Sequence, residues 1–207
     1  MHPRTVHIGL LSVGILILIW SAINPQDQFT WLLEVIPVLL IVPILIITYT
    51  RFKWSTLTYC AIFIHATILM VGGHYTYAEV PLFNWIRDAF NLSRNHYDRI
   101  GHFAQGFIPA IVAHELLVRK KVFADKRWLP LVVVCICMAI SASYELIEWG
   151  VAEATGSAAD AFLGTQGDVW DTQWDMFLAL LGAVSASIIT RNRSYSEQPN
   201  TQLNKST

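Results

Sequence analysis

Carboxylate and imidazole side chains recur at helical spacing in short segments that flank the apolar runs of this chain. Asp98 and His102 are four residues apart, and Glu145 and Glu148 are three residues apart, so each pair would lie on one face of a helix. Such groups bind divalent metal ions and transfer protons in active sites. The spacing therefore predicts two helices that each present a pair of reactive groups in one direction.

A third group of acids lies in the stretch 160–176, which reads DAFLGTQGDVWDTQWDM and stands between two apolar segments. Asp168, Asp171 and Asp175 follow one another at steps of three and four residues, entering the second of these segments. An unpaired carboxylate inside a bilayer costs about 3 kcal/mol. Something must therefore hold these aspartates, either cationic side chains, hydrogen-bond donors or a metal ion.

A histidine at the end of another apolar run, His74, could complete a shared site, because four helices would then direct polar groups at one point. Carboxylates and imidazoles suit Mg, Mn, Zn or Fe, and a bound cation would relieve the repulsion among the acids. We assign candidate roles as follows: metal ligands His74, His102, Glu145, Asp168 and Asp171; catalytic proton carriers Glu148 and Asp175; other members of the polar centre Asp98 and Arg99.

The same residues also allow a purely structural network. Asp98 could pair with a neighbouring arginine, and Asp171 and Asp175 could cap the helix that they begin. His102 could donate to a backbone carbonyl. The sequence leaves both interpretations open.

The composition indicates a membrane protein. Of 207 residues, 54% are hydrophobic and only 14% are charged, which leaves room for about six spans of roughly 20 residues each. The net charge of -1 gives no basic surface for nucleic acid. We therefore predict an all-α, polytopic membrane protein whose partner is the lipid bilayer.

One membrane domain, 1–190, is expected to be a six-helix transmembrane bundle with spans at about 6–23, 31–50, 54–73, 101–118, 128–149 and 171–190. Pro37 and Pro43 predict bends in the second span. Between 74 and 95 the apolar residues recur at steps of three and four, which predicts an amphipathic helix in the membrane interface. The segment 151–168 is expected to be a polar loop at the outer face, and the tail 191–207 to be disordered.

The orientation follows from the basic residues. With six spans, eleven lie on one side: Arg4, Arg51, Lys53, Arg119, Lys120, Lys121, Lys126, Arg127, Arg191, Arg193 and Lys205. Only Arg87, Arg94 and Arg99 lie on the other. The first side should be cytoplasmic, with both termini inside, and the candidate site should face the periplasm of a bacterial inner membrane.

Other polar groups fit structural roles better. His65 and His114 lie inside apolar runs, where a hydrogen-bonded core histidine is the usual case, and Glu115 lies near a basic loop, where an ion pair is expected. The cysteines also lie inside apolar runs, without a CxxC pattern, and are interpreted as core residues: Cys60, Cys135 and Cys137.

Three functions are compatible with these features. The first is metal-assisted hydrolysis or transfer on an amphiphilic, lipid-linked substrate. The second is transport coupled to protons or ions, because acids and histidines within a membrane also mark ion pathways. The third is a non-catalytic binding or assembly module whose acidic outer surface meets a partner.

Four runs resemble a known family: MVGGHYTYAEVP at 70–81, RNHYDRIGHFAQGF at 94–107, YELIEW at 144–149 and the stretch 160–176. Together they are similar to the YjdF-type bacterial inner-membrane proteins, a domain-of-unknown-function family, over about residues 1–190. The resemblance implies a polytopic location in the inner membrane. It implies no activity and no catalytic residues.

Overall fold

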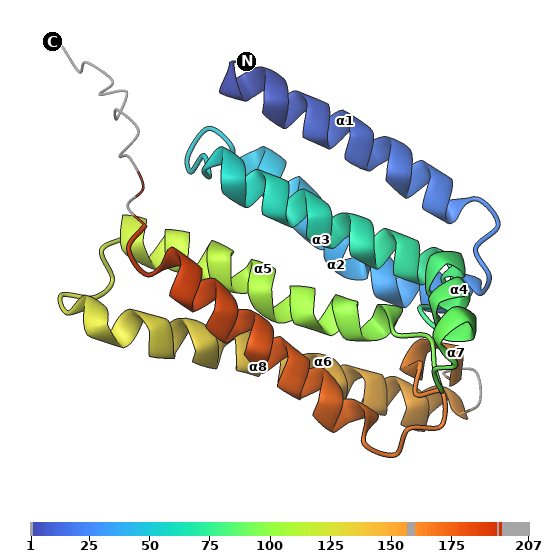
Figure 1. The fold of residues 1–207 in the computed structure, drawn as a ribbon. Coiled ribbons are helices and arrows are strands. Elements are labelled where there is room, and N and C mark those ends of the chain that lie inside the picture. Colours follow the sequence, from blue (N-terminus) through green and yellow to red (C-terminus); the bar gives the residue numbers. More distant parts are fainter. Residues whose placement is uncertain (1, 157–159, 194, 196–207) are drawn as a thin grey trace, which may run out of the picture.

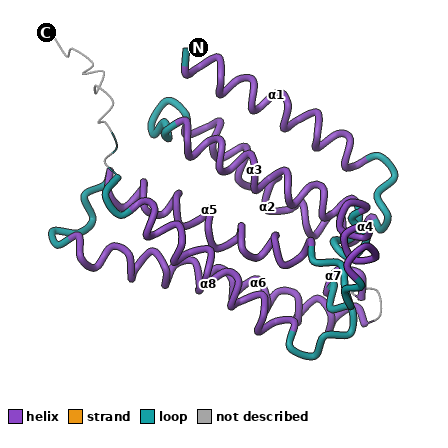
Figure 2. Tube along the Cα trace, viewed as in Figure 1, coloured by secondary structure: helices purple, strands orange, loops and turns teal. Residues whose placement is uncertain are grey.

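The computed structural model describes residues 2–156, 160–193 and 195, and that part of the chain is helical, without strands (Figure 2). The helices are α1 (Pro3–Ala22), α2 (Gln28–Thr48), α3 (Thr56–His74), α4 (Pro81–Phe90), α5 (Tyr97–Arg119), the 3₁₀ helix η1 (Lys126–Trp128), α6 (Leu129–Thr155), α7 (Asp160–Leu163) and α8 (Asp171–Thr190). The predicted all-α class is confirmed.

In the described part of the chain, five helices are long and apolar enough to cross a membrane: α1, α2, α3, α6 together with η1, and α8. They overlap five of the expected spans, whose bounds in the membrane stay a prediction. The remaining span corresponds to α5, which has 23 residues but carries many polar side chains, several of them buried in the bundle. A sixth crossing by α5 stays a prediction.

The helices form two halves (Figure 1). In the first half α1 and α2 each pack against α3, and in the second half α5, α6 and α8 pack against one another. Contacts between α3 and α5 join the halves. The main apolar core lies in the second half and at this junction, where Ile108, Val133 and Ala183 are buried. The polar candidates on α5, α6 and α8 are therefore carried by one closely packed unit.

The closest approach is between α5 and α8. A Cβ atom at Gly106 would overlap the backbone carbonyl of Ala179, and one at Gly182 would overlap the carbonyl of Phe103. Small residues at such crossings let two membrane helices approach closely. This approach fixes the first turns of α5 and α8 beside each other, although they are more than 70 residues apart in sequence.

The two ends of the bundle differ. The beginning of α1 and the end of α8 lie at one end, and the short helices α4 and α7 lie at the other (Figure 1). In α4 the apolar side chains Leu82, Trp85 and Phe90 are exposed, as expected for a helix that rests in the membrane interface.

Some expected details differ. The chain is helical to Thr155, so α6 is longer than predicted, because nothing stops the helix before Gly156, which has φ +60°. Pro37 and Pro43 lie inside α2, and the bends expected at them stay a prediction. The expected loop 151–168 also contains α7. Most of the expected disordered tail, including Lys205, lies outside the described residues.

Candidate functional site

The polar centre forms where α5 and α8 begin. Asp98 lies in the first turn of α5 and Asp171 is the first residue of α8. Negative side chains are favoured there because they meet the free N–H groups and the positive end of the helix dipole. Both carboxyl groups are buried, and the free N–H groups and dipole of the helix alone do not offset the cost of burying their charge.

Arg99 joins three aspartates. Its Nη1 donates to Asp175 Oδ1 at 2.6 Å, and its Nη2 donates to Asp168 Oδ2 and to Asp171 Oδ1, each at 2.9 Å. The same guanidinium reaches the backbone carbonyl of Asp171 at 3.3 Å. A planar guanidinium can hold several acceptors at once, so Arg99 organises the start of α8.

Arg94 is a second arginine of the centre, and it is buried, 5% exposed. It donates to Asp171 Oδ1 and, at 3.3 Å, to Asp98 Oδ2, and it lies 3.6 Å from Asp168 Oδ2. It also donates to the backbone carbonyls of Gly164 at 3.2 Å and Thr165 at 3.3 Å. Arg94 therefore ties the loop before α8 to the loop before α5.

That connection is reinforced next to it. The N–H of Asn95 donates to Gln166 Oε1 at 2.9 Å, and Gln166 Nε2 donates back to the Asn95 carbonyl at 3.0 Å. The turn needs left-handed backbone at Gly164 and Gly167, with φ +58° and +83°, which glycine adopts without strain.

His102 lies one turn below Asp98 and faces carboxylates on both sides. Its Nε2 is 3.3 Å from Asp98 Oδ1 and 3.8 Å from Asp175 Oδ1. Its Nδ1 is 3.2 Å from Gln105 Oε1 and 3.8 Å from Glu145 Oε1. The ring is 7% exposed, so these groups, rather than water, form its surroundings.

Three of these residues form a group that could hold a metal ion. Asp98, His102 and Asp175 are all buried and offer ligand atoms that lie within 4.8 Å of one another. Two ligand atoms bound to one ion at about 2.1 Å can be at most about 4.2 Å apart. The two separations from His102 Nε2, 3.3 and 3.8 Å, lie within this limit. The third separation, of up to 4.8 Å, exceeds it, so the two aspartates would have to approach each other by about 0.6 Å or more to share an ion with His102.

Further acids extend the centre toward α2 and α6. Tyr144 OH donates to Glu34 Oε2 at 3.0 Å, and the buried Glu34 carboxylate interacts electrostatically with Asp98 and His102. Glu145 is buried, and its Oε1 has no hydrogen-bond partner among the described residues. Glu148 is half-buried on the same face of α6.

The structure brings together most, but not all, of the candidates from the sequence. Arg99 holds Asp168 and Asp171, and Glu145 lies beside His102 on the side away from Asp98. His74 is not part of this group. Its Nδ1 lies 3.0 Å from the carbonyl of Ser21, and its ring packs on Trp20 with centroids 4.5 Å apart.

Two members of the centre, Arg94 and Glu34, are not among the candidate site residues predicted from the sequence. Arg94 stands four residues before Asp98, a spacing that indicates an ion pair on one helical face, but Arg94 precedes α5 and reaches Asp98 from the loop. Glu34 is a lone acid in an apolar run, which by itself marks a functional or paired group in a membrane. Its partner Tyr144, which is 110 residues away, could not be read from spacing.

Arg94 and Arg99 also act on a histidine outside the spans. Burial, together with the positive charges of Arg94 and Arg99, lowers the pKa of His96, which caps the beginning of α5.

Comparison with known proteins agrees with this architecture. A family profile described as "Predicted membrane protein (DUF2238)" matches residues 6–194. The inner membrane protein YjdF of Escherichia coli (strain K12) is 53% identical over 188 residues, which cover 91% of this chain and 90% of that protein. No solved structure matches. The similarity supports the inner-membrane, multi-pass character predicted from the sequence, and the chain belongs to the DUF2238 family of membrane proteins.

Proposed function

We propose that the polar centre binds one divalent metal ion and that it carries out metal-assisted hydrolysis or transfer on an amphiphilic, lipid-linked substrate at the periplasmic face. The observation that carries this proposal is the convergence of Asp98 and His102 on α5 with Asp175 on α8, with three buried ligand atoms within 4.8 Å. Oxygen and imidazole ligands suit Mg, Mn, Zn or Fe.

The charges of the centre support a bound cation. Four aspartates pair with the guanidinium groups of Arg94 and Arg99, and a fifth carboxyl group, that of Glu145, lies beside His102; the aspartates are Asp98, Asp168, Asp171 and Asp175. Fully ionised, they leave an excess of three negative charges. A divalent ion beside a neutral His102 would offset two of these three charges. Without an ion, carboxyl groups or His102 must take up protons to reduce the excess.

The surroundings of His102 support the same proposal. A histidine that binds a metal through one nitrogen usually donates its other N–H to a carboxylate or carbonyl, which fixes the orientation of the ring. His102 presents Nε2 to Asp98 and Asp175. Its Nδ1 lies 3.2 Å from Gln105 Oε1, an acceptor within hydrogen-bond distance, and 3.8 Å from Glu145 Oε1.

The chemistry would be divided among few groups. A bound ion would activate a water molecule or stabilise a developing oxyanion. Glu148 lies one turn from Glu145 on the same face of α6 and would take up the proton. Arg94 and Arg99 hold the remaining aspartates, so these do not compete for the ion.

Substrate access is also consistent with an amphiphile. A hollow of about 360 Å³ opens at the start of α8, lined by Thr165, Gly167, Asp168, Val169, Asp171 and Thr172. Val169 in its lining and the adjacent Trp170 are exposed apolar side chains. A polar substrate group could enter this hollow while its lipid portion stays in the bilayer.

Metal analysis tests the proposal. We would purify the protein in detergent, measure bound metals by inductively coupled plasma mass spectrometry, and titrate the metal-free protein with Mn²⁺ by electron paramagnetic resonance. The variants are His102→Ala and Asp175→Asn. The control is His114→Ala, which removes a buried histidine at the other end of α5, where its Nδ1 meets Tyr195.

The expected result is about one ion per chain in the unmodified protein and in His114→Ala, and at least tenfold weaker Mn²⁺ binding in the two site variants. Equal binding by all four proteins, or no stoichiometric ion in any preparation, would contradict the proposal. Thermal melting of each variant in detergent separates loss of the site from loss of the fold.

A second candidate is proton-coupled transport, which one observation favours. The hydrogen-bonded pair Glu34 and Tyr144 continues the polar centre toward α2, and His65 on α3 has a buried Nε2 without a hydrogen-bond partner among the described residues. His65 interacts electrostatically with His102. A line of titratable groups thus leads from the outer end into the bundle.

Reconstituted vesicles with an internal pH dye distinguish this candidate. A transporter would acidify the lumen when an inward proton gradient is imposed, and Glu34→Gln would abolish the signal. Proton flux equal to that of protein-free vesicles would exclude a proton-conducting role under those conditions, and it would leave the metal proposal untouched.

A further inference from the structure

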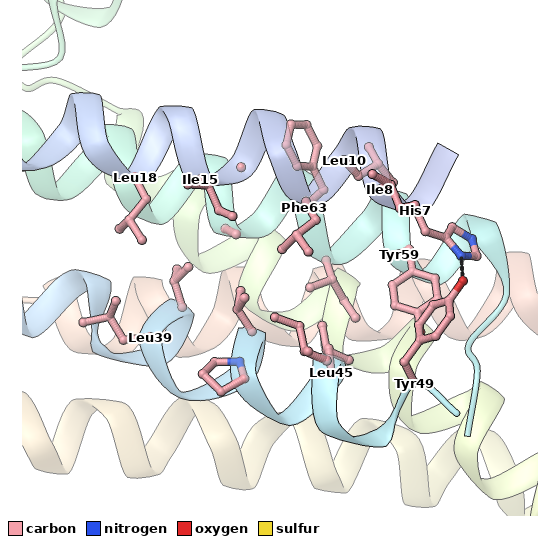
Figure 3. Close-up of a pocket in the computed structure, with 18 of the residues that line it drawn as sticks. His7, Ile8, Leu10, Ile15, Leu18, Leu39, Leu45, Tyr49, Tyr59 and Phe63 are labelled. Atoms are coloured by element: carbon pink, nitrogen blue, oxygen red, sulfur yellow. Dashed lines mark hydrogen bonds between the residues drawn. The ribbon is translucent and has the colours of Figure 1, made fainter. Parts of the chain in front are cut away.

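The first half of the bundle contains a cavity that the polar centre does not use. It has a volume of about 470 Å³ and lies between α1, α2 and α3 (Figure 3). Apart from four residues at one end, its walls are apolar side chains and Gly14. No acidic residue lines it. The cavity is therefore suited to hydrocarbon rather than to a polar solute.

The two ends of the cavity are different. Figure 3 shows Leu18 and Leu39 at one end and His7 and Tyr49 at the other. Beyond the apolar end, Trp31 Nε1 donates to Ser21 Oγ at 3.1 Å and closes the space between α1 and α2. At the polar end Arg4, His7, Tyr49 and Tyr59 form the lining.

The cavity is open at the side. Its lining residues Ile8, Ile15 and Ile46 are 56%, 46% and 55% exposed, because α1 packs mainly on α3 and leaves a gap toward α2. These surfaces face the hydrocarbon of a bilayer if α1 and α2 span it. An empty gap would forfeit dispersion contacts along its whole lining, so a flexible chain that fills it is favoured.

The length of the cavity matches one leaflet. From Arg4 to Leu18, α1 rises about 21 Å at about 1.5 Å per residue. Half of a bilayer's hydrocarbon core is about 15 Å, and the headgroup region adds several ångströms. One acyl chain with its headgroup at the Arg4 end therefore fits this distance.

The polar end carries positive charge. The guanidinium of Arg4 is exposed and has no partner among the described residues. The Lys53 ammonium lies 5.6 Å from the centre of the Tyr49 ring. His7 Nδ1 lies 2.9 Å from Tyr49 OH and its Nε2 3.0 Å from Thr56 Oγ1, so His7 holds the wall at this end rather than binding directly.

From this shape and charge we propose that the cavity between α1, α2 and α3 is a binding site for one anionic phospholipid. An acyl chain lies between α1 and α2 with its end near Leu18 and Leu39. The phosphate lies at Arg4 and Lys53, on the side of the bundle where the basic loops gather. This site is separate from the polar centre and does not depend on a metal ion there.

The chain offers a matched pair of variants for the test. A Cβ at Gly14 would have only the Phe63 ring near it, at 3.8 Å, so Gly14→Leu places its side chain in the cavity without a backbone clash. Gly9 lies on the same helix but not in the cavity lining, and a Cβ there has nothing within 4 Å. Gly9→Leu therefore adds the same side chain to α1 and leaves the cavity unchanged.

The experiment is native mass spectrometry of the full chain, released from nanodiscs of phosphatidylglycerol mixed with an equal amount of phosphatidylcholine. We expect one retained phosphatidylglycerol in the unmodified protein and in Gly9→Leu, and at least a fivefold lower retained fraction in Gly14→Leu. The double variant Arg4→Gln, Lys53→Gln should keep a lipid but lose the preference for phosphatidylglycerol.

Equal retention by Gly14→Leu and Gly9→Leu would overturn the acyl-chain site. An unchanged preference in the Arg4→Gln, Lys53→Gln variant would overturn the placement of the phosphate. If Gly14→Leu does not fold, Ala66→Leu on α3 narrows the same cavity from its other wall and serves in its place.

Discussion

Arg99 Nη1 donates to Asp175 Oδ1 at 2.6 Å, and this part-buried contact joins the first turn of α5 to the second turn of α8. Asp175 faces His102 Nε2 from the same oxygen, at 3.8 Å. One carboxylate therefore serves both the arginine network and the proposed metal site. Variants can separate the two roles, because the network stabilises the fold whereas the metal site requires His102.

Replacing Arg99 with lysine should lower the stability of the protein. Lysine is a point charge and cannot hold the three aspartates that the guanidinium holds, so we expect a loss of about 1 to 3 kcal/mol. Thermal or denaturant unfolding in detergent measures it. Arg87→Lys is the control, since the Arg87–Asp88 pair is exposed; an equal effect at both positions would mean that the Arg99 network is not stabilising.

Glu115 should stabilise the end of the bundle that lies away from the polar centre. Its fully buried carboxylate accepts from Ser55 N and Oγ, each at 2.8 Å, and from Thr58 Oγ1 at 2.5 Å, and it pairs with Arg119 at 2.8 Å. This is the ion pair expected from the sequence. Glu115→Ala leaves the buried Thr58 hydroxyl and the half-buried Ser55 and Arg119 donors without this acceptor, so we expect a loss of about 3 to 5 kcal/mol.

The matched control for Glu115 is Asp125→Ala, because Asp125 pairs with an exposed Arg127. Its unfolding free energy should change by less than about 1 kcal/mol. If Glu115→Ala lowers the unfolding free energy no more than this control does, the hydrogen bonds and ion pair of Glu115 do not stabilise the fold.

A side chain at Gly106 should separate α5 from α8. Since a Cβ there would overlap the Ala179 carbonyl, Gly106→Val requires the backbones to move apart, at a cost of about 3 kcal/mol or more. Both stability and metal binding should fall together, because the site depends on this crossing. Gly150→Val is the control on α6, where a Cβ meets nothing within 4 Å; similar losses from both variants would argue against close packing as the cause.

The pH dependence of stability should reveal His96. Burial and the two arginines lower the folded-state pKa of His96, so the unfolded chain binds a proton more readily at this position. His96 therefore does not change the free energy of unfolding above about pH 6.5, and it lowers this free energy as the pH falls below that value. Compared with the unmodified protein, His96→Gln should lose less stability between pH 7 and pH 5. Identical pH profiles would show that the pKa of His96 does not change on folding.

The sequence by itself determined the helical membrane class. An apolar run of about 20 residues favours the hydrocarbon of a bilayer whichever segments pack against it. In lipid, the backbone N–H and C=O groups must be hydrogen-bonded within the same helix, so local composition is enough to predict helical spans. The spacing of Asp98 with His102, and of Asp171 with Asp175, likewise fixed which side chains share a helical face.

Only the tertiary structure decided which faces meet. The close crossing at Gly106 and Gly182 brings Asp175 to His102, and the long reach of Arg94 and Arg99 assigns Asp168 and Asp171 to guanidinium groups. His74 lies instead beside Trp20 and Ser21, because α3 packs between α1 and α2 at that end. Helical periodicity gives the direction of a side chain around its own helix, but the partner depends on the packing of helices far apart in the chain.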